Sequence, residues 1–266
     1  MMDPTRRFSN RVDNYVRYRP GYPPAVLDLL AARCGLTATS VVADLGSGTG
    51  ILTGRLLQSG ARIFAVEPNP EMRAAAEKLP AHHPNFTSLA GTAEATPLPD
   101  HSVDFITAGQ AFHWFDRDQA RREFLRLLKP GGWVVLIWND RNLSDRPFSQ
   151  AYEQLLRAHA TDYAVVNHKN VDAEVLRSFF GPAGYGEASY PNDQTFDYAG
   201  LKGRLLSSSY APEAGDPRHV PMLAALQSLF QAHQTNGTVT FDYDTTVFYG
   251  RLSDPGKLVA YPRKSE

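Results

Sequence analysis

The residues best suited to chemistry are a glycine-rich turn and the acids beside it. An apolar run over 41–45 contains Asp44 and leads into the turn. The turn holds three glycines at alternate positions: Gly46, Gly48 and Gly50. Glycines let backbone amides approach a ligand without obstruction by a Cβ atom. A second apolar run, 62–66, ends in Glu67, about 20 residues after Gly46, where a carboxylate can accept hydrogen bonds from ribose hydroxyls. This pattern predicts a nucleotide-like cofactor.

The spacing of the turn alone leaves other interpretations open. A dinucleotide-binding fingerprint would place glycine or alanine at position 51, where the chain has Ile51. A tight turn that binds nothing is also compatible with the glycines. The residues after Glu67 favour a cofactor site, because Pro68-Asn69-Pro70 suits the start of a helix and brings Met72 into its first turns.

Five segments resemble, in order, the motifs of class I S-adenosylmethionine-dependent methyltransferases. They are residues 43–50, 66–69, 91–99, 102–115 and 127–132. The stretch Tyr-Val-Arg-Tyr-Arg-Pro-Gly-Tyr-Pro at 15–23 is similar to the lead-in of small-molecule methyltransferases of the trans-aconitate type. The resemblance implies an enzyme that uses S-adenosylmethionine to methylate a small-molecule acceptor through an O, N or C nucleophile.

The resemblance also assigns residues to parts of the cofactor. The methionine end would be held by Asp44, Gly46, Ser47 and Gly48, with Gln110 and Ala111 close by after the fourth strand. The ribose would be held by Glu67 with Pro68, and the adenine by Met72, Ala93 and Glu94. Tyr15 and Arg19 would fold over the methionine carboxylate, which a guanidinium can bind with two parallel hydrogen bonds. The same basic, aromatic segment is also compatible with a solvated helix or a single-stranded nucleic-acid surface.

His113 is the candidate catalytic residue, because it is the only possible base in the loop after the fourth strand. A histidine has a reference pKa near ~6.5, which suits proton removal at neutral pH. The alternative is that His113 and Trp114 only form a wall of the pocket. Methyl transfer needs no covalent residue, since orientation of the reactants alone can lower the barrier by ~7–11 kcal/mol.

Substrate contacts are predicted in the C-terminal half. Asn139 closes the fifth strand at the site end and is a candidate hydrogen-bonding partner of the substrate. Ser208 and Tyr210 lie at a predicted helix end, where they either hold a small acid or cap the helix. Trp114 completes the candidate substrate-binding residues. Aromatic residues such as Tyr152 and Tyr163 line a pocket or belong to the core.

Several classes of site are disfavoured. Gln110 stands where magnesium-dependent catechol-type enzymes have an acid, and His82-His83 is interpreted as a solvated loop, so no metal is expected. The net charge of −1 argues against a nucleic-acid partner. The single cysteine, Cys34, excludes an intramolecular disulfide and is expected to be buried. No apolar stretch reaches the ~20 residues of a membrane span and residues 1–7 lack the apolar core of a secretion signal, so a cytoplasmic monomer or homodimer without membrane contact is expected.

Alternating strands and helices predict a doubly wound α/β fold with a seven-stranded, mostly parallel sheet. Strands are expected at 41–45, 62–66, 86–90, 103–107, 133–138, 184–196 and 237–251. Helices are expected at 24–34, 50–58, 70–79, 117–128, twice within 147–180, at 198–207 and at 219–234. The chain is divided as one domain, 1–266, with an N-terminal cap (1–40), a cofactor-binding core (41–140), a helical lid with the sixth strand (141–236) and a last strand (237–252).

Two further functions share these features. An enzyme that uses S-adenosylmethionine for cyclisation or for transfer of another group would keep the cofactor motifs and differ only in the pocket. A non-catalytic cofactor-binding protein would keep the fold, although the intact loop around His113 argues against it.

Overall fold

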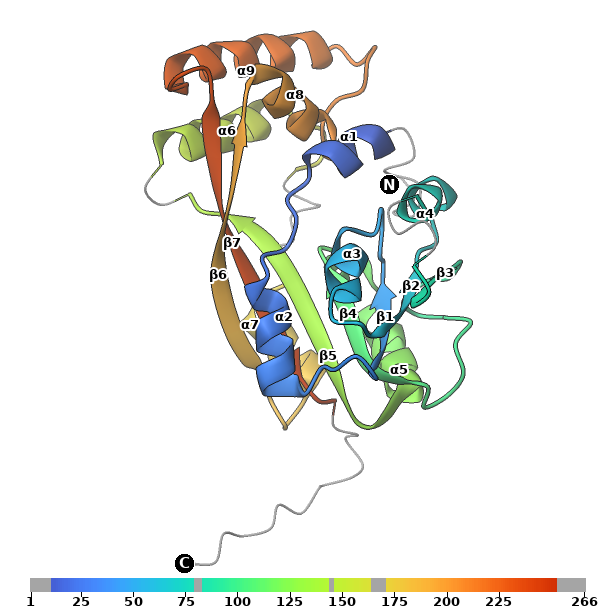
Figure 1. Ribbon diagram of the computed structural model, residues 1–266. Coiled ribbons are helices and arrows are strands. Elements are labelled where there is room, and N and C mark those ends of the chain that lie inside the picture. Colours follow the sequence, from blue (N-terminus) through green and yellow to red (C-terminus); the bar gives the residue numbers. More distant parts are fainter. Residues whose placement is uncertain (1–10, 79–82, 144–145, 164–170, 253–266) are drawn as a thin grey trace, which may run out of the picture.

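The computed structural model describes residues 11–78, 83–143, 146–163 and 171–252. It contains a seven-stranded sheet in the order β3-β2-β1-β4-β5-β7-β6, which confirms the predicted fold class (Figure 1). Strands β1 to β5 pair in parallel, and β7 is antiparallel to both of its neighbours. The strands are β1 Val41–Leu45, β2 Arg62–Val66, β3 Phe86–Leu89, β4 Val103–Gly109, β5 Leu128–Arg141, β6 Gly186–Phe196 and β7 Val239–Gly250.

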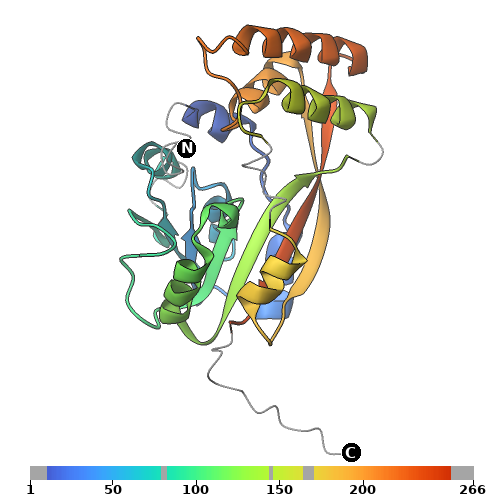
Figure 2. The ribbon, with the colours of Figure 1, turned by 180° about the vertical axis from the view of Figure 1, so that it is seen from behind.

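Helices cover both faces of the sheet. On one face lie α2 (Ala25–Leu29), its continuation as a π-helix η2 (Leu30–Cys34), and α3 (Ile51–Leu57). On the other face lie α5 (Arg117–Leu127) and α7 (Ala173–Phe180), as the view from behind shows (Figure 2). This double cover explains why the run from Val134 to Ile137 is apolar without alternation: all four side chains are buried.

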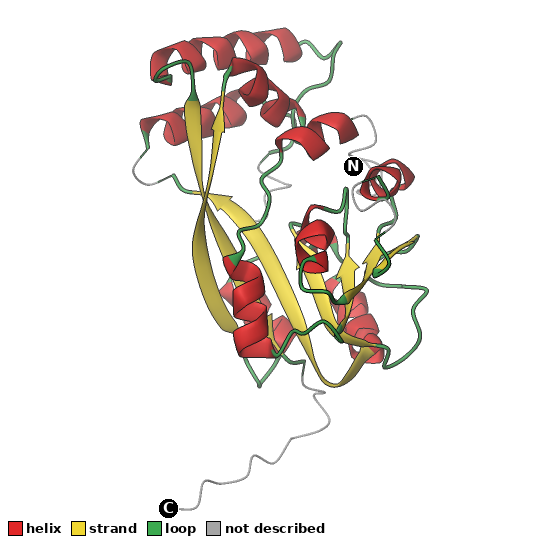
Figure 3. Cartoon of the chain, in the orientation of Figure 1, coloured by secondary structure: helices red, strands yellow, loops and turns green. Residues whose placement is uncertain are grey.

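A second layer, here called the cap, stands beyond the sheet. It consists of α6 (Pro147–His159), α8 (Tyr198–Leu206), α9 (His219–His233) and the ends of β6 and β7 that reach them (Figure 3). These elements share an apolar core of their own, in which Tyr152, Leu226 and Phe241 are almost fully buried. The cap therefore has its own packing and is joined to the rest of the sheet by continuous strands.

The lid is composed differently from the expectation. Of the two helices between β5 and β6, only α6 joins the cap, whereas α7 packs against the sheet through Phe179 and Phe180. The Phe179 ring lies 5.7 Å from the Phe124 ring of α5 and 4.6 Å from the Phe112 ring. The cap is completed by α8 and α9, which lie between β6 and β7 in the chain.

Strand β5 is longer at both ends than the predicted 133–138. At its start, Leu128 already pairs with Val103, and a register shift absorbs the glycines that resembled a turn. At its end, pairing with β7 continues to Arg141, opposite Tyr243. The extension matters for function, because it carries three polar residues past the end of β4.

Other predictions concern single residues. Cys34 is buried as predicted, and burial raises the pKa of its thiol to about 11. His82 and the first residues of the chain lie outside the described residues. Among the helices that are described, none has the length and apolar character needed to cross a bilayer.

Candidate functional site

A cavity of about 250 Å³ lies at the carboxyl ends of β1, β2, β4 and β5, between the sheet and the cap. Every predicted site residue except Ser208 lines it. We call the part beside Asp44 and Glu67 the core end, and the part beside Arg141 and Arg204 the cap end. Ligands of doubly wound sheets bind beyond the carboxyl ends of the strands, so the position of the cavity fits the fold.

The glycine turn shapes the core end. Gly46 has a φ of +63°, and a Cβ atom on it would lie 2.8 Å from the Cβ of Ala111. The turn is held by backbone bonds from Gly46 and Ser47 to the carbonyl of Val66, at 2.9 and 3.2 Å. A side chain at Gly46 would therefore strain the backbone and separate the turn from the loop after β4.

Asp44 lies at the floor of the core end and is fully buried. Its carboxylate accepts hydrogen bonds from the hydroxyls of Thr53, at 2.6 Å, and Thr107, at 2.9 Å. Burial raises the pKa of Asp44 to about 6, with a further contribution from Glu67, while the two threonine bonds oppose the shift. A ligand ammonium group beside this carboxylate would favour its ionised form.

Glu67 ties the end of β2 to the glycine turn. Its Oε2 accepts from the amide of Gly48 at 2.8 Å, and its Oε1 accepts from the amide of Asn69 at 2.9 Å. Burial raises its pKa, and the two amide bonds partly oppose this. Each oxygen keeps a second lone pair for a ligand hydroxyl. Asn69 caps helix α4 (Pro70–Ala76) by accepting from the amide of Met72, which places Met72 in the cavity wall.

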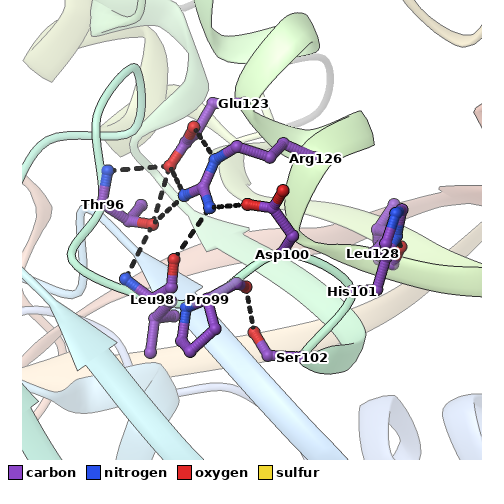
Figure 4. A network of polar contacts seen from close by, with 9 residues as sticks. All are labelled: Thr96, Leu98, Pro99, Asp100, His101, Ser102, Glu123, Arg126 and Leu128. Carbon is purple, nitrogen blue, oxygen red and sulfur yellow. Dashed lines mark hydrogen bonds and ion pairs between the residues drawn. The ribbon is translucent and has the colours of Figure 1, made fainter.

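The loop over residues 91–99 is held from outside by α5 (Figure 4). Glu123 accepts from the amide and the hydroxyl of Thr96, at 2.8 and 2.7 Å. Arg126 pairs with Glu123 and Asp100 at 2.6 Å and donates to the carbonyl of Leu98 at 2.9 Å. Glu94 accepts from the amide of Asp116 at 2.9 Å, so part of its carboxylate is engaged at the start of α5. These bonds fix the loop that presents Ala93 and Glu94 to the cavity.

The loop after β4 contains an unusual backbone conformation. Gln110 has a φ of +56°, which is uncommon for a residue with a side chain and is found at functional sites. Its amide donates to the carbonyl of Ile137 at 2.8 Å, and its side chain donates to the carbonyl of Asn139 at 3.0 Å. The loop continues into a short 3-10 helix, η3 (Phe112–Trp114), in which the rings of His113 and Trp114 lie 4.8 Å apart. Both line the cavity.

The N-terminal segment crosses the cavity as helix α1 (Val12–Tyr18) and the residues after it. Arg19 lies over the ring of Tyr15, at 4.8 Å, and donates to the carbonyl of Ser207 at 3.0 Å. Its Nε is buried and finds no hydrogen-bond acceptor among the described residues. The guanidinium therefore retains donor capacity toward the cavity.

Asn139 lines the cavity, where it is predicted to contact the substrate, and its side chain also has partners within the protein. Its side-chain NH₂ donates to the carbonyl of Gly21 at 3.1 Å, and its Oδ1 accepts from Thr245 and from Asn192. Asn192 donates to the same Gly21 carbonyl at 2.8 Å. Asn139 lines the cavity, but its amide is engaged in fastening the N-terminal segment to the sheet.

Ser208 is also engaged in the protein. It is fully buried and accepts from Arg204 at 3.1 Å, and it is not part of the cavity lining, where its neighbours Ser209 and Tyr210 are found. Burial alone would raise the pKa of the Tyr210 phenol, but Arg141, Arg204 and Arg19 hold it below its ordinary value. Tyr210 thus lies in a strongly positive environment.

Most residues of the cap end were not predicted from the sequence. Its main residues come from four elements and one loop: Arg141 of β5, Glu153 of α6, Tyr163 of the loop after α6, Arg204 of α8 and Tyr243 of β7. Arg141 pairs with Glu153 at 3.0 Å and donates to the Tyr163 hydroxyl at 2.9 Å. Tyr163 in turn donates to Glu153 at 2.6 Å. Of these residues, only Tyr163 was considered as a pocket residue from the sequence. The alternation of the last strand predicts that Tyr243 points inward, but it gives no indication of the residues that Tyr243 contacts.

The residues of the core end fit the cofactor implied by the motifs. Several buried polar atoms of the cavity lining find no hydrogen-bond partner among the described residues, including Arg19 Nε, Ser47 Oγ and Thr49 Oγ1. Buried polar groups are rarely left unpaired, and such atoms indicate a missing ligand. Donors of this kind suit a carboxylate, Asp44 suits an ammonium group, and Glu67 suits ribose hydroxyls.

Comparisons with known proteins agree with this geometry. A family model described as "Methyltransferase domain" matches residues 43–136. An uncharacterized methyltransferase of Mycobacterium tuberculosis is 44% identical over 140 residues, which is 53% of this chain and 55% of that protein. An uncharacterized methyltransferase of Geobacillus kaustophilus is 30% identical over 202 residues, which is 71% of this chain and 91% of that protein.

The fold is shared with solved structures as well. A proposed type II methyltransferase from Anaeromyxobacter dehalogenans superposes with a TM-score of 0.66 at 23% identity, covering 88% of this chain and 98% of that chain. The chain spans about half the length of the Mycobacterium relative that it matches. The family model matches residues 43–136, which include Asp44 and Glu67 of the core end, whereas the helices of the cap begin at Pro147 and lie outside it.

Proposed function

This chain belongs to the methyltransferase family, and we propose that it transfers a methyl group from S-adenosylmethionine to a small-molecule acceptor. The observation that carries the proposal is the continuous cavity. Its core end presents the cofactor motifs, and its cap end presents a separate set of polar and aromatic groups. One cavity can thus hold a methyl donor and an acceptor side by side.

We assign the core-end residues to parts of the cofactor. Asp44 would hold the ammonium group, Arg19 with Tyr15 the carboxylate, and Glu67 with Pro68 the ribose. The turn residues Gly46, Ser47 and Gly48 would lie against the methionine, with Gln110 and Ala111 near the sulfur. Met72, Ala93 and Glu94 would enclose the adenine. When bound, S-adenosylmethionine supplies an electrophilic methyl group on a positively charged sulfur.

The chain's own contribution is mainly orientation and exclusion of water. The Gln110 backbone is fixed by Ile137, and the segment after Arg19 is fixed by Asn139, so the walls on both sides of the reacting atoms are rigid. Alignment of this kind can account for about 7–11 kcal/mol of barrier lowering. For an acceptor that loses a proton, we propose that the imidazole of His113 takes it, with Trp114 beside it as a wall against water.

Calorimetry with S-adenosylmethionine and S-adenosylhomocysteine tests the cofactor assignment without any acceptor. We expect both to bind the wild type, and Glu67→Ala to weaken both at least tenfold because two ribose hydroxyls lose their acceptor. Glu187→Ala, on β6 away from the cavity, serves as the control and should bind as the wild type does. Absence of binding to the wild type contradicts the proposal.

The reaction type is tested by product analysis with a panel of small acceptors. Methyl transfer yields S-adenosylhomocysteine and a methylated acceptor, whereas transfer of another group or cyclisation yields methylthioadenosine. Cofactor binding without either product across the panel would favour a binding protein. His113→Ala with near-full turnover would eliminate the base role and leave His113 as a wall.

A further inference from the structure

We propose that the acceptor is a small organic anion whose charged group binds Arg204 of helix α8. The inference rests on the proposed function, because it specifies the occupant of the cap end. It is carried by a buried arginine that lines the cavity and whose hydrogen-bond partners among the described residues are all neutral.

Arg204 is 5% exposed. Its Nε donates to the Tyr243 hydroxyl at 3.1 Å, and its Nη1 donates to Ser208 Oγ at 3.1 Å. In the part of the chain that the structure describes, no carboxylate lies within ion-pair distance of Arg204, and nothing accepts a hydrogen bond from Nη2. Burying a charge without an opposite charge is costly, so proteins retain such a group where a ligand supplies the counter-charge.

The neighbouring charges do not neutralise Arg204. Arg141 is the second arginine of the cap end, and its partner Glu153 is shared with Arg157, at 3.2 Å. Asp140, the other acid of this end, is not paired with Arg204. The positive charge is large enough to hold the pKa of the buried Tyr210 phenol below its ordinary value. Within the described residues, Arg141 has an acidic partner and Arg204 has none.

The cofactor itself is the alternative occupant, through its carboxylate. Burial is the main cause that lowers the pKa of Arg19, and the positive charge of Arg204 lowers it further. The two guanidinium groups therefore lie close to each other. Arg19, however, extends from the N-terminal segment and has a donor atom of its own without a partner. Arg204 belongs to the cap and is oriented by Tyr243 and Ser208, which are cap residues. We assign the cofactor carboxylate to Arg19 and the acceptor's anion to Arg204.

The surrounding side chains narrow the class of acceptor. A guanidinium binds carboxylate and phosphate groups in a planar, bidentate manner. The hydroxyl-bearing rings of Tyr163, Tyr210 and Tyr243 border the same space and suit a small, polar carbon skeleton. A neutral acceptor would leave the guanidinium buried without a counter-charge.

The test uses protein saturated with S-adenosylhomocysteine, so that the core end is filled. Succinate, inorganic phosphate and, as a neutral probe, succinamide are titrated by calorimetry. We expect one of the two anions to bind and succinamide not to bind. Preference for succinate indicates a carboxylate acceptor, and preference for phosphate indicates a phosphorylated one.

Arg204→Met should weaken that anion at least tenfold while leaving the affinity for S-adenosylhomocysteine within threefold. It should not lower the Tm of the ligand-free protein, because it removes a buried charge, whereas a purely structural role would lower it. Arg204→Lys keeps the charge and should restore part of the anion affinity. Arg218→Met, on an exposed arginine that pairs with Asp216, is the matched control and should change none of these values.

Three results overturn the inference: binding of succinamide as tightly as succinate, binding of neither anion, or equal loss of S-adenosylhomocysteine and anion in Arg204→Met. The last result would assign Arg204 to the cofactor. Failure of the wild type to bind S-adenosylhomocysteine would instead contradict the proposed function, so the two failures are distinguishable.

Discussion

At the core end of the cavity most of the charged side chains are acids, whereas at the cap end two arginines stand beside two acids and Arg204 has no acidic partner among the described residues. Asp44 and Glu67 follow directly from two parallel strands, and backbone amides and threonine hydroxyls satisfy their oxygens. Arg141 and Arg204 come from an extended strand and a cap helix and are surrounded by phenols. This difference underlies our proposals that the core end binds the cationic donor and that the cap end binds an anion.

The largest effect on stability and on binding at the core end is expected at the glycine turn. Gly46→Ala should combine left-handed backbone strain with a clash against Ala111, and together these cost about 2–5 kcal/mol of unfolding free energy. We expect binding of S-adenosylhomocysteine to be lost. Gly237→Ala is the matched control, because Gly237 also has a positive φ, +80°, but has open space around it. It should cost about 1 kcal/mol and leave binding unchanged; equal effects of the two variants in denaturation and calorimetry would contradict the argument.

The pH dependence of stability sharpens the acidic half of the comparison. Because the buried carboxyl of Asp44 has a pKa of about 6 rather than 3.8, the native state keeps a proton that the unfolded chain releases. The free energy of unfolding should therefore fall by about 3 kcal/mol as the pH rises from about 4 to about 6. Above about pH 6 it should stay level. Asp44→Asn should remove this fall and be more stable than the wild type at pH 8 in urea denaturation.

The same proton affects cofactor binding with the opposite sign. A cationic ligand favours ionised Asp44, so the affinity for S-adenosylmethionine should rise as the pH rises through about 6. In Asp44→Asn this rise should disappear and the affinity should be low at every pH. An unchanged pH profile in the variant would show that Asp44 does not face the ligand's charge.

A smaller effect is expected where the N-terminal helix meets the cap. Arg11 donates to the carbonyls of Ser208 and Ala211, both at 2.7 Å, and of Leu206 at 3.2 Å. Arg11→Met should weaken this attachment by about 2–4 kcal/mol and speed hydrogen exchange in α1. Affinity for S-adenosylhomocysteine should fall about tenfold, since Tyr15 lies in this helix and Arg19 lies directly after it. Arg17→Met, on an exposed side chain of the same helix, should leave both measurements unchanged.

The smallest effect on binding is expected at the loop over residues 91–99, which we assign to the adenine. Arg126→Met removes the bonds to Glu123, Asp100 and Leu98 but leaves every cavity residue in place. We expect affinity for adenosine, which probes only this part of the core end, to fall about three- to fivefold, or about 1 kcal/mol. A loss of succinate or phosphate affinity without a loss of adenosine affinity would contradict the separation of the two ends.

The two ends also differ in how far the sequence predicts them. Asp44, Gly46 and Glu67 lie within continuous motifs at the ends of apolar runs, where local pattern and function coincide. Arg141 was missed because the apolar run of β5 ends at Trp138, while pairing with β7 continues three residues further. Arg204 and Tyr243 meet only through tertiary packing of α8 against β7, and no spacing in the chain indicates such a contact.

The fold can likewise be divided into a part that the sequence predicts and a part that it does not. The parallel strands and their crossover helices were predicted from apolar runs that are covered on both faces. The assignment of α7 to the lid failed because its apolar side is equally suited to a cap or to the sheet, and only contact with Phe112 and Phe124 decides between them. Asn139 lines the cavity, but its bond to the carbonyl of Gly21, 118 residues away in the chain, could not be predicted from the sequence.

The position of β7 between β5 and β6 has a consequence for the order in which the protein forms. β6 pairs only with β7 in the described sheet, and β7 follows the two helices α8 and α9 in the chain. During synthesis, β6 and the cap helices therefore emerge from the ribosome before the strand that attaches them to the sheet exists. The pairing of distant segments is slow, so we expect the core end to become native first and the arginine-lined end to form only after β7 is inserted.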